Sequence, residues 1–378
     1  MKYFLIAGEP SGDLHGANLL KGLIKEDAAA EFRFWGGDAM ASVGGEQNLL
    51  KHYRESSFFG IIEVLRNLKT ISKQLEECEA SIQEFAPDVV ILIDYPGFNM
   101  KIAKFAKEQG VKTFYYIAPK VWASRSGRIK AMRKYIDELF IIFPFEQEYF
   151  SERGIEPHFC GNPLTDALAS KVESLPTREE FVAENNLGEK PIIALLAGSR
   201  LSEIKANLPL MISASKEFPA HQFVVAGVPW LEREVYENLL AGSDIKIVTD
   251  KTYELLTSAE AAIVTSGTAT LETALLNIPE VVVYRVRLIL QIVAPLIVHA
   301  KFISLVNINL NRESVREVVQ SSMDARPTIE ALRKIIVGGS ERERMLKDFK
   351  ELRAIIGSSG ASDRFAAKMV NLLKSKKI

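Results

Sequence analysis

Short runs of β-branched and aromatic residues alternate with longer amphipathic stretches along most of the chain. This alternation is typical of parallel sheets whose strands are joined by crossover helices. In the first half it predicts strands over 3–7, 32–35, 89–93, 113–117 and 139–143. After Pro163 the pattern starts again, and it predicts strands over 192–196, 223–226, 245–248, 261–265 and 281–284. We therefore expect an α/β protein with two doubly wound, Rossmann-like domains that face one another across a cleft.

The restart of the pattern also predicts where the domains divide. A polar hinge over 161–191 follows the first set of strands, so we expect an N-terminal domain over 1–163 and a C-terminal domain over 164–344. The end of the chain is helical, and its last helix repeats apolar residues at helical spacing, namely Phe365, Met369, Leu372 and Leu373. We expect the C-terminal segment 345–378 to pack back on the first domain or on a partner subunit.

Composition narrows the function without defining it. The 378 residues are 47% hydrophobic and 25% charged, as in an ordinary globular protein, and the net charge of −1 gives no global reason to expect nucleic acid. Neither the two cysteines nor the five histidines have the spacing of a metal site, so we expect no metal and no bound cofactor. The apolar start is too short for a signal peptide, and the apolar stretch 288–300 is too short for a membrane span, which predicts a cytoplasmic protein.

The first predicted strand runs into a glycine-containing turn, Gly8-Glu9-Pro10-Ser11-Gly12-Asp13, and then into a helix. Main-chain amides at such a junction can approach an anionic ligand, and Glu9 lies at the carboxyl end of a strand, where parallel sheets bind ligands. We therefore count Glu9, Ser11 and Gly12 as candidate site residues. The alternative is a tight turn in which Ser11 or Asp13 caps the helix. The dinucleotide pattern G-x-G-x-x-G is absent, which argues against a nicotinamide enzyme.

A second candidate follows the fully apolar strand 89–93, which ends abruptly at Asp94. Parallel strands end at the same edge of a sheet, so Asp94 should lie on the same side as Glu9. Two acids at one site can divide the tasks of general base and substrate positioning, and the pattern leaves open which of them is the base. The alternative is that Asp94 only caps the next helix or begins a turn.

The second half contains two turns suited to a diphosphate. The first is Gly198-Ser199-Arg200, where a guanidinium can neutralise phosphate oxygens; the second is Ser266-Gly267-Thr268, where amides and hydroxyls lie at a helix start. One helical turn further on, Glu272 can accept hydrogen bonds from ribose hydroxyls. With no Asp-x-Asp pair to bind a metal, Arg285 is a further candidate for charge neutralisation. The alternatives are a solvated turn arginine and a plain capping box.

Taken together, these motifs resemble the lipid-A-disaccharide synthase family. The matching segments follow the family's order along nearly the whole chain and include AGEPSGDLHGANLL from Ala7, FFGIIEVL from Phe58, DYPGFN from Asp94, IAPKVWA from Ile117, GNPL from Gly161, LLAGSRLSEI from Leu195, TSGTATLETAL from Thr265 and FISLVN from Phe302. The resemblance implies a GT-B fold and a metal-independent, inverting glycosyltransferase. Its nearest rivals are another GT-B UDP-sugar glycosyltransferase and a UDP-sugar epimerase; a silent nucleotide-binding protein would not need Asp94.

The resemblance also implies a reaction and a role for each residue. In that reaction 2,3-diacylglucosamine is transferred from its UDP derivative to 2,3-diacylglucosamine 1-phosphate, giving a β-1,6-linked disaccharide and UDP. Asp94 would take the proton of the acceptor 6-hydroxyl, while Arg200 and the Ser266-Gly267-Thr268 turn would stabilise the departing diphosphate. Glu9 and Ser11 would line the cleft from the first domain, and Ser11 and Gly12 would also contact the UDP-sugar. Asn307 and Glu272 would hold the nucleoside.

One apolar segment predicts contact with a membrane, because the implied substrates carry acyl chains and no membrane span is visible. Arg66, Lys69 and Lys73 place cations near it, as anionic lipid requires. The alternative is a crossover helix buried on the sheet. If the prediction holds, the protein is peripheral on the inner face of the inner membrane; a homodimer is left open. The residues expected to touch lipid are Phe58, Phe59, Ile61, Ile62, Leu65 and Leu68.

Overall fold

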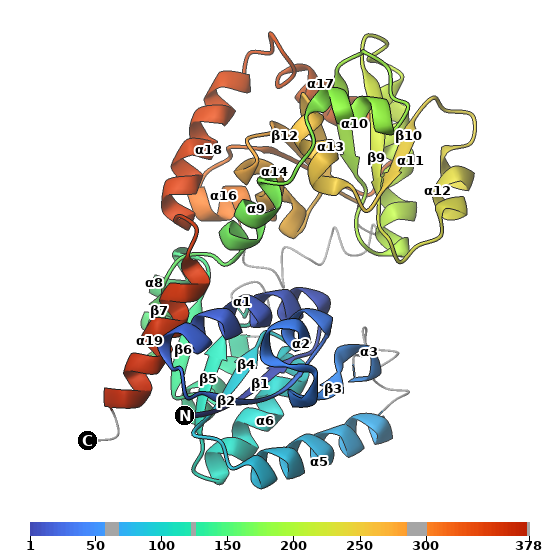
Figure 1. Cartoon of the computed structure of the whole chain (residues 1–378). Helices are drawn as coiled ribbons and strands as arrows, with labels where there is room; N and C mark the ends of the chain where they lie inside the picture. Colours follow the sequence, from blue (N-terminus) through green and yellow to red (C-terminus); the bar gives the residue numbers. More distant parts are fainter. Residues whose placement is uncertain (57–67, 122–125, 286–300, 376–378) are drawn as a thin grey trace. The chain divides into compact units, whose positions relative to one another are not determined.

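The computed structural model describes residues 1–56, 68–121, 126–285 and 301–375. The chain forms two compact units. Unit 1 contains residues 1–167 together with 356–378, and unit 2 contains residues 168–355. Each unit is built on a parallel sheet (Figure 1). The two-domain α/β architecture expected from the sequence is therefore confirmed.

The sheet of unit 1 has seven strands in the order β3-β2-β1-β4-β5-β6-β7. Every strand pair in it is parallel. Strands β1, β2 and β3 follow one another toward one edge of the sheet. The chain then returns to β4, beside β1, and strands β4 to β7 follow one another toward the other edge. The strand order thus reverses its direction between β1 and β4. The strands are β1 Lys2–Ala7, β2 Glu31–Gly36, β3 Leu49–His52, β4 Val89–Ile93, β5 Lys112–Tyr116, β6 Glu138–Ile141 and β7 Pro157–Phe159.

Alternate side chains of β1 enter two separate cores, one on each face of this sheet. Tyr3 and Leu5 pack on the face covered by α1, α2 and α19, whereas Phe4 and Ile6 pack on the face covered by α5 and α6. Burial on both faces explains why the strands are continuous apolar runs. The helices are α1 Pro10–Glu26, α2 Asp38–Gly44, α3 Tyr53–Ser56, α5 Leu68–Phe85, α6 Pro96–Glu108, α7 Ile129–Tyr135, α8 Phe145–Ser151 and α19 Ala361–Ser375. Helix α9, Leu164–Val172, begins in unit 1 and continues into unit 2.

The last helix, α19, lies against α1 within unit 1 (Figure 1). A Cβ atom added to Gly22 would lie 2.7 Å from that of Ala366, so the two helices approach closely only because residue 22 is glycine. The rings of Phe365 and Tyr116 of the sheet pack edge to face, with their centroids 5.1 Å apart. The apolar positions predicted for this helix therefore belong to the core of unit 1.

The sheet of unit 2 has six parallel strands in the order β10-β9-β8-β11-β12-β13, so its strand order reverses its direction between β8 and β11. The strands are β8 Ile192–Leu196, β9 Gln222–Gly227, β10 Lys246–Thr249, β11 Ala261–Thr265, β12 Glu280–Arg285 and β13 Arg316–Gln320. The helices are α10 Arg178–Glu184, α11 Leu201–Ser215, α12 Arg233–Leu240, α13 Thr252–Ser258, α14 Thr268–Leu275, α16 Leu305–Leu310, α17 Arg326–Arg333 and α18 Arg342–Ile356.

All ten strands predicted from the sequence are present, with ends that coincide or are displaced by at most two residues. Among the described residues, no helix is long and apolar enough to cross a membrane. Five of the residues predicted to touch lipid, Phe58, Phe59, Ile61, Ile62 and Leu65, lie outside the described residues, and the sixth, Leu68, is the first residue of α5.

Candidate active site

Both candidate acids of unit 1 follow strands that lie side by side. Ala7 at the end of β1 pairs with Ile93 at the end of β4. Glu9 follows Ala7 by two residues, and Asp94 comes directly after Ile93. Both acids therefore follow the carboxyl ends of neighbouring strands, at the point where the strand order of the sheet reverses its direction. In open α/β sheets this is where ligands bind.

The backbone at Asp94 adopts an uncommon conformation. Asp94 and Tyr95 both have positive φ, at 45° and 47°. The carbonyl oxygen of Asp94 accepts hydrogen bonds from Tyr115 Oη at 2.5 Å and from Asn99 Nδ2 at 2.8 Å, which hold the turn in place. Asp94 is not the cap of α6, because that position is Tyr95 and no side chain caps it. Two consecutive left-handed residues that are not glycine cost roughly 1–3 kcal/mol each, and such strain clusters at functional sites.

Gly8 makes this turn possible from the neighbouring strand. A Cβ atom at residue 8 would lie 2.3 Å from Cδ1 of Tyr95, so the tyrosine ring occupies the space that a side chain would need. The same ring stacks on Phe98, with the centroids 5.6 Å apart. The glycine after β1 and the aspartate after β4 are therefore parts of one packed arrangement.

The surroundings of the Asp94 carboxyl alter its acidity. Burial raises the pKa of Asp94, while the nearby Lys120 and a main-chain hydrogen bond at Tyr95 oppose this rise. Burial acts on the charged form, and a neighbouring cation favours it. The net upward direction brings the pKa of this carboxyl closer to the range in which a general base is effective near neutral pH.

The helix after Glu9 is not capped as the alternative interpretation required. The cap position of α1 is Glu9 itself, with no side-chain capping hydrogen bond. Asp13 is buried and accepts instead from the amides of Gly37, Ala39 and Met40 at the start of α2. Ser11 is exposed in the first turn of α1. Position 12 lies against the ends of both strands, since an added Cβ would be 3.4 Å from that of Ala7 and 3.8 Å from Cγ2 of Ile93.

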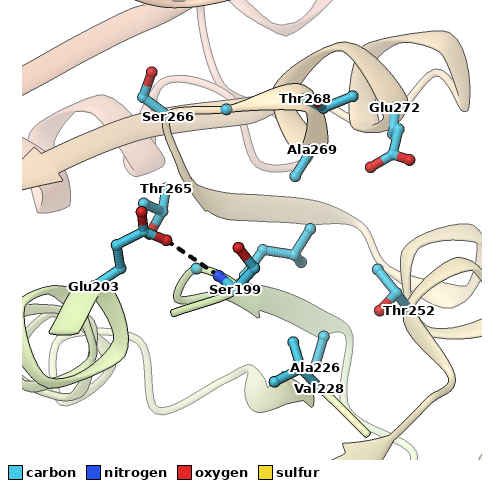
Figure 2. Close-up of a pocket in the computed structure, with 13 residues that line it drawn as sticks. Ser199, Glu203, Ala226, Val228, Thr252, Thr265, Ser266, Thr268, Ala269 and Glu272 are labelled. Atoms are coloured by element: carbon cyan, nitrogen blue, oxygen red, sulfur yellow. Dashed lines mark hydrogen bonds between the residues drawn. The ribbon is translucent and has the colours of Figure 1, made fainter. Parts of the chain in front are cut away.

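Unit 2 has a cavity of about 290 Å³ at the carboxyl ends of β8, β9 and β11 (Figure 2). It includes the whole predicted turn Ser266-Gly267-Thr268, and Gly198 and Ser199 of the other predicted turn, but Arg200 is not among its lining residues. The cavity lies where the strand order of this sheet reverses its direction. Its lining mixes small residues and hydroxyls with two carboxylates: Leu196, Gly198, Ser199, Glu203, Ala226, Val228, Thr252, Thr265, Ser266, Gly267, Thr268, Ala269 and Glu272.

The start of α14 faces this cavity. Gly267 is the cap residue of the helix and no side chain caps it, so the predicted alternative of a capping box is wrong here. The first amides of the helix are therefore available to an anion. The hydroxyl of Ser266 donates to the carbonyl of Ile303 at 3.0 Å and points away from the cavity in Figure 2. The amide of Ser266 donates to the carbonyl of Val283 at 3.1 Å, so both donors of Ser266 bond within the chain, whereas Thr268 lines the cavity at the helix start.

The start of α11 is already occupied by a carboxylate of the chain. Glu203 accepts hydrogen bonds from the amides of Ser199 at 3.2 Å and Arg200 at 3.4 Å. It also pairs with the guanidinium of Arg200 at 3.2 Å, although that side chain is 74% exposed. Gly198 permits this arrangement, because a Cβ atom there would lie 2.7 Å from the Cβ of Glu203. Arg200 can leave so exposed an ion pair at little cost.

Glu272 lies at the other side of the cavity, where Figure 2 shows its carboxylate extending from α14 toward the side on which Thr252 lies. Burial raises the pKa of Glu272, while a hydrogen bond from Tyr253 and the charge of Lys171 oppose the rise. The Tyr253 hydroxyl donates to Glu272 Oε1 at 2.7 Å. A carboxylate on a cavity wall can accept hydrogen bonds from sugar hydroxyls.

The remaining two candidates of unit 2 are not among the residues lining this cavity. Arg285 donates to the carbonyls of Ala206 at 3.1 Å and Ser321 at 3.4 Å. Asn307 is fully buried; its amide nitrogen donates to Val315 and Glu317, and its oxygen accepts two main-chain amides. Both side chains therefore fasten neighbouring segments together.

The lining or supporting residues that were not predicted as site residues include Thr252, Thr265 and Tyr253. Thr252 and Tyr253 begin α13 directly after β10, so the polar stretch after the predicted strand 245–248 was the available signal. Thr265 ends β11 and is held by buried Asn207, whose amide donates to its hydroxyl at 3.1 Å. Within the described part of the chain, no group of three or more His, Cys, Asp or Glu side chains is arranged to hold a metal ion.

Comparison with solved structures places the chain among proteins with the GT-B fold. The UDP-GlcNAc 2-epimerase from Neisseria meningitidis, solved with UDP-GlcNAc, aligns with a TM-score of 0.71 over 98% of this chain and 100% of that one, at 13% identity. The calicheamicin glycosyltransferase CalG4 aligns with a TM-score of 0.60 over 99% and 98% of the two chains, also at 13% identity. At such low identity these likenesses show the fold alone.

Sequence comparison is more specific. The family model for lipid-A-disaccharide synthetase matches residues 3–368. A lipid-A-disaccharide synthase from Myxococcus xanthus is 36% identical, covering 98% of this chain and 97% of its own length. Another from Syntrophus aciditrophicus is 32% identical with the same coverage. The chain belongs to the lipid-A-disaccharide synthetase family and is a glycosyltransferase. Its reaction is the transfer of diacylglucosamine described above, from a UDP-sugar donor to a lipid A precursor.

Proposed function

We propose that unit 2 binds the UDP part of the donor and that unit 1 activates the acceptor. The observation that carries this proposal is that different chemical groups follow the strands of the two sheets. The edge of unit 1 holds two acids, Glu9 and Asp94, and the cavity of unit 2 has the uncapped start of α14. An anion is favoured at a helix start, whereas a half-buried carboxylate suits proton transfer.

Asp94 takes the proton of the acceptor 6-hydroxyl in this proposal. The oxygen then attacks the anomeric carbon from the face opposite UDP, which inverts that centre, and the bond to the diphosphate oxygen breaks. The raised pKa and strained backbone of Asp94 support the role. Glu9 lies at the same edge and orients the acceptor, with Ser11 and Gly12 beside it at the start of α1.

The departing diphosphate is stabilised from unit 2. The amides around Gly267 and Thr268 face its oxygens, and Arg200 swings from its exposed pair with Glu203 to neutralise charge. Ser266 supports this turn through its bonds to Val283 and Ile303. Glu272 accepts from the ribose hydroxyls, so that donor recognition uses both ends of the cavity.

Arg285 and Asn307 support the donor site through the elements that they hold. Arg285 ties the end of β12 to α11, whose N-terminal cap residue is Arg200. Asn307 fastens α16 to the segment that leads into β13.

We also propose peripheral contact with the inner face of the inner membrane through the predicted apolar segment that includes Phe58 and Leu68, and a homodimer remains part of the hypothesis. The acyl chains of donor and acceptor support the first idea, because substrates of this kind reside in a lipid surface. Neither idea is needed for the chemistry at Asp94.

One assay tests the reaction itself. Purified protein is given the UDP-diacylglucosamine donor and the 1-phosphate acceptor with EDTA present, and we expect UDP and the disaccharide to appear in equal amounts. The control omits the acceptor, where UDP release should fall to the background. UDP-sugar epimerisation without disaccharide would favour the epimerase alternative, and loss of activity in EDTA would contradict a metal-independent mechanism.

A further inference from the structure

Tyr253 lies immediately beside the cavity of unit 2 and contacts one of its two acids. It is in the first turn of α13, and its hydroxyl donates to Glu272 Oε1 of α14 at 2.7 Å. Its neighbour Thr252 lines the cavity, as does Glu272 itself. The tyrosine thus reaches a cavity residue from outside the lining.

The hydrogen bond fixes a side chain that would otherwise rotate. A glutamate has three rotatable side-chain bonds, and a charge-assisted hydrogen bond from a phenol holds one carboxylate oxygen at a defined place. Lys171 adds to this arrangement, because its Nζ lies over the ring of Tyr253, 4.9 Å from the centroid. The second oxygen, Oε2, then remains for a ligand.

We propose that Tyr253 is a positioning residue for ribose recognition: it holds the Glu272 carboxylate so that its free oxygen accepts hydrogen bonds from the vicinal hydroxyls of the nucleotide. The inference rests on the proposed role of Glu272 in the donor site. A purely structural tyrosine would only join α13 to α14, and the two ideas differ in what they predict for nucleotides that lack those hydroxyls.

The test measures binding of UDP and of 2′,3′-dideoxy-UDP by calorimetry. Tyr253→Phe keeps the ring and removes only the donor. We expect it to weaken UDP binding about tenfold, as for a lost hydrogen bond to a charged group, and to leave dideoxy-UDP binding unchanged. Thr257→Val is the matched control, since Thr257 lies on the same helix and its hydroxyl bonds only to main-chain carbonyls.

A double-mutant cycle with Glu272→Gln separates the possible failures. If Tyr253 acts through Glu272, the double variant binds UDP no more weakly than Glu272→Gln alone. Additive losses, or equal losses for both nucleotides, overturn the positioning role. If Glu272→Gln itself leaves the preference for UDP over dideoxy-UDP intact, the proposed role of Glu272 fails and this inference fails with it.

The pH dependence provides a second measurement that does not rely on one variant. Both the Tyr253 hydroxyl and the Lys171 charge favour the ionised form of Glu272. UDP binding should weaken as pH falls through the pKa of Glu272, and this decline should begin at higher pH in Tyr253→Phe and in Lys171→Met. An unchanged profile in both variants, with their melting temperatures preserved, overturns the proposal.

Discussion

Replacing Asp94 by asparagine and by alanine separates its chemistry from its backbone conformation. Asparagine cannot accept the acceptor's proton, but it tolerates the left-handed region almost as well as aspartate. Alanine removes the carboxyl and must also occupy φ 45°, which costs roughly 1–2 kcal/mol. The hydrogen bonds from Tyr115 and Asn99 end on the Asp94 carbonyl, so both variants can retain them.

We therefore expect equal losses of turnover but unequal stabilities. Loss of a general base lowers turnover about 10²- to 10⁴-fold, or roughly 3–5 kcal/mol in the activation free energy. Both variants should fall within this range and keep their affinity for UDP. Asp94→Asn should melt like the wild type, whereas Asp94→Ala should melt several degrees lower, by about 2–4 °C for each kcal/mol in units of this size.

The assay is steady-state release of UDP at saturating donor and acceptor, with calorimetric measurement of UDP affinity beside it. Glu9→Gln provides the comparison, because it removes the other acid at the same edge. A folded Asp94→Asn protein with near-normal turnover would refute the reasoning. If that result came together with a large loss in Glu9→Gln, the base would be Glu9.

The pH profile follows from the direction of the pKa shift. A base must be deprotonated, and burial raises the pKa of Asp94, so kcat/KM should fall with decreasing pH at values above the ordinary aspartate range. Lys120 opposes the rise, so Lys120→Met should move this acid limb to still higher pH. A limb that does not move would show that Lys120 does not act on the titrating group.

Arg200→Ala should weaken UDP binding about 10- to 100-fold, and Arg200→Lys should weaken it less than that, because an ammonium keeps the charge but lacks the forked donors. The control is Arg233→Ala, which breaks another exposed ion pair. An unchanged dissociation constant in Arg200→Ala would exclude Arg200 from the site. Burial raises the pKa of Glu280 well above its usual range, so its stabilising effect is present at acid pH and is lost as pH rises from the unfolded-state value toward the folded one. Glu280→Gln should therefore flatten the decline of Tm as pH rises above the ordinary range of a glutamate, and an equal decline in both proteins would contradict this. Serine replacements in the predicted lipid-contacting segment should reduce flotation with anionic liposomes at unchanged Tm, and unchanged flotation would remove the membrane prediction; the positions are Phe59, Ile62 and Leu65.

The sequence pattern predicted the central strands well because they are buried on both faces. β4 and β8 are uninterrupted apolar runs, and their predicted and observed ends coincide. The three strands that were missed, β3, β7 and β13, lie at the edges of the sheets. Their sequences mix polar and apolar residues, since an edge strand is only partly covered, and a short run of this kind resembles a loop.

The site was predictable at the level of turns and not at the level of hydrogen bonds. Glycine turns after apolar strands are local signals, so the regions around Glu9 and Gly267 could be recognised. The partners of Glu203, Asn307 and Tyr253 depend on which segments the fold brings together, and no local pattern contains that information. For Asn307 the resemblance implied contact with the nucleoside, whereas the structure places its amide in a buried set of hydrogen bonds.

The close approach of Gly8 and Tyr95 limits how this protein can vary. Position 8 is 86 residues away from Asp94 along the chain, yet any side chain there would displace the ring that follows Asp94 directly. A methyl group at residue 8 would therefore disturb the turn that carries Asp94 without touching either acid. Libraries that diversify the first turn should keep residue 8 as glycine. Where residue 8 is varied, residue 95 should be varied with it, because the ring of Tyr95 occupies the space that a new side chain would need.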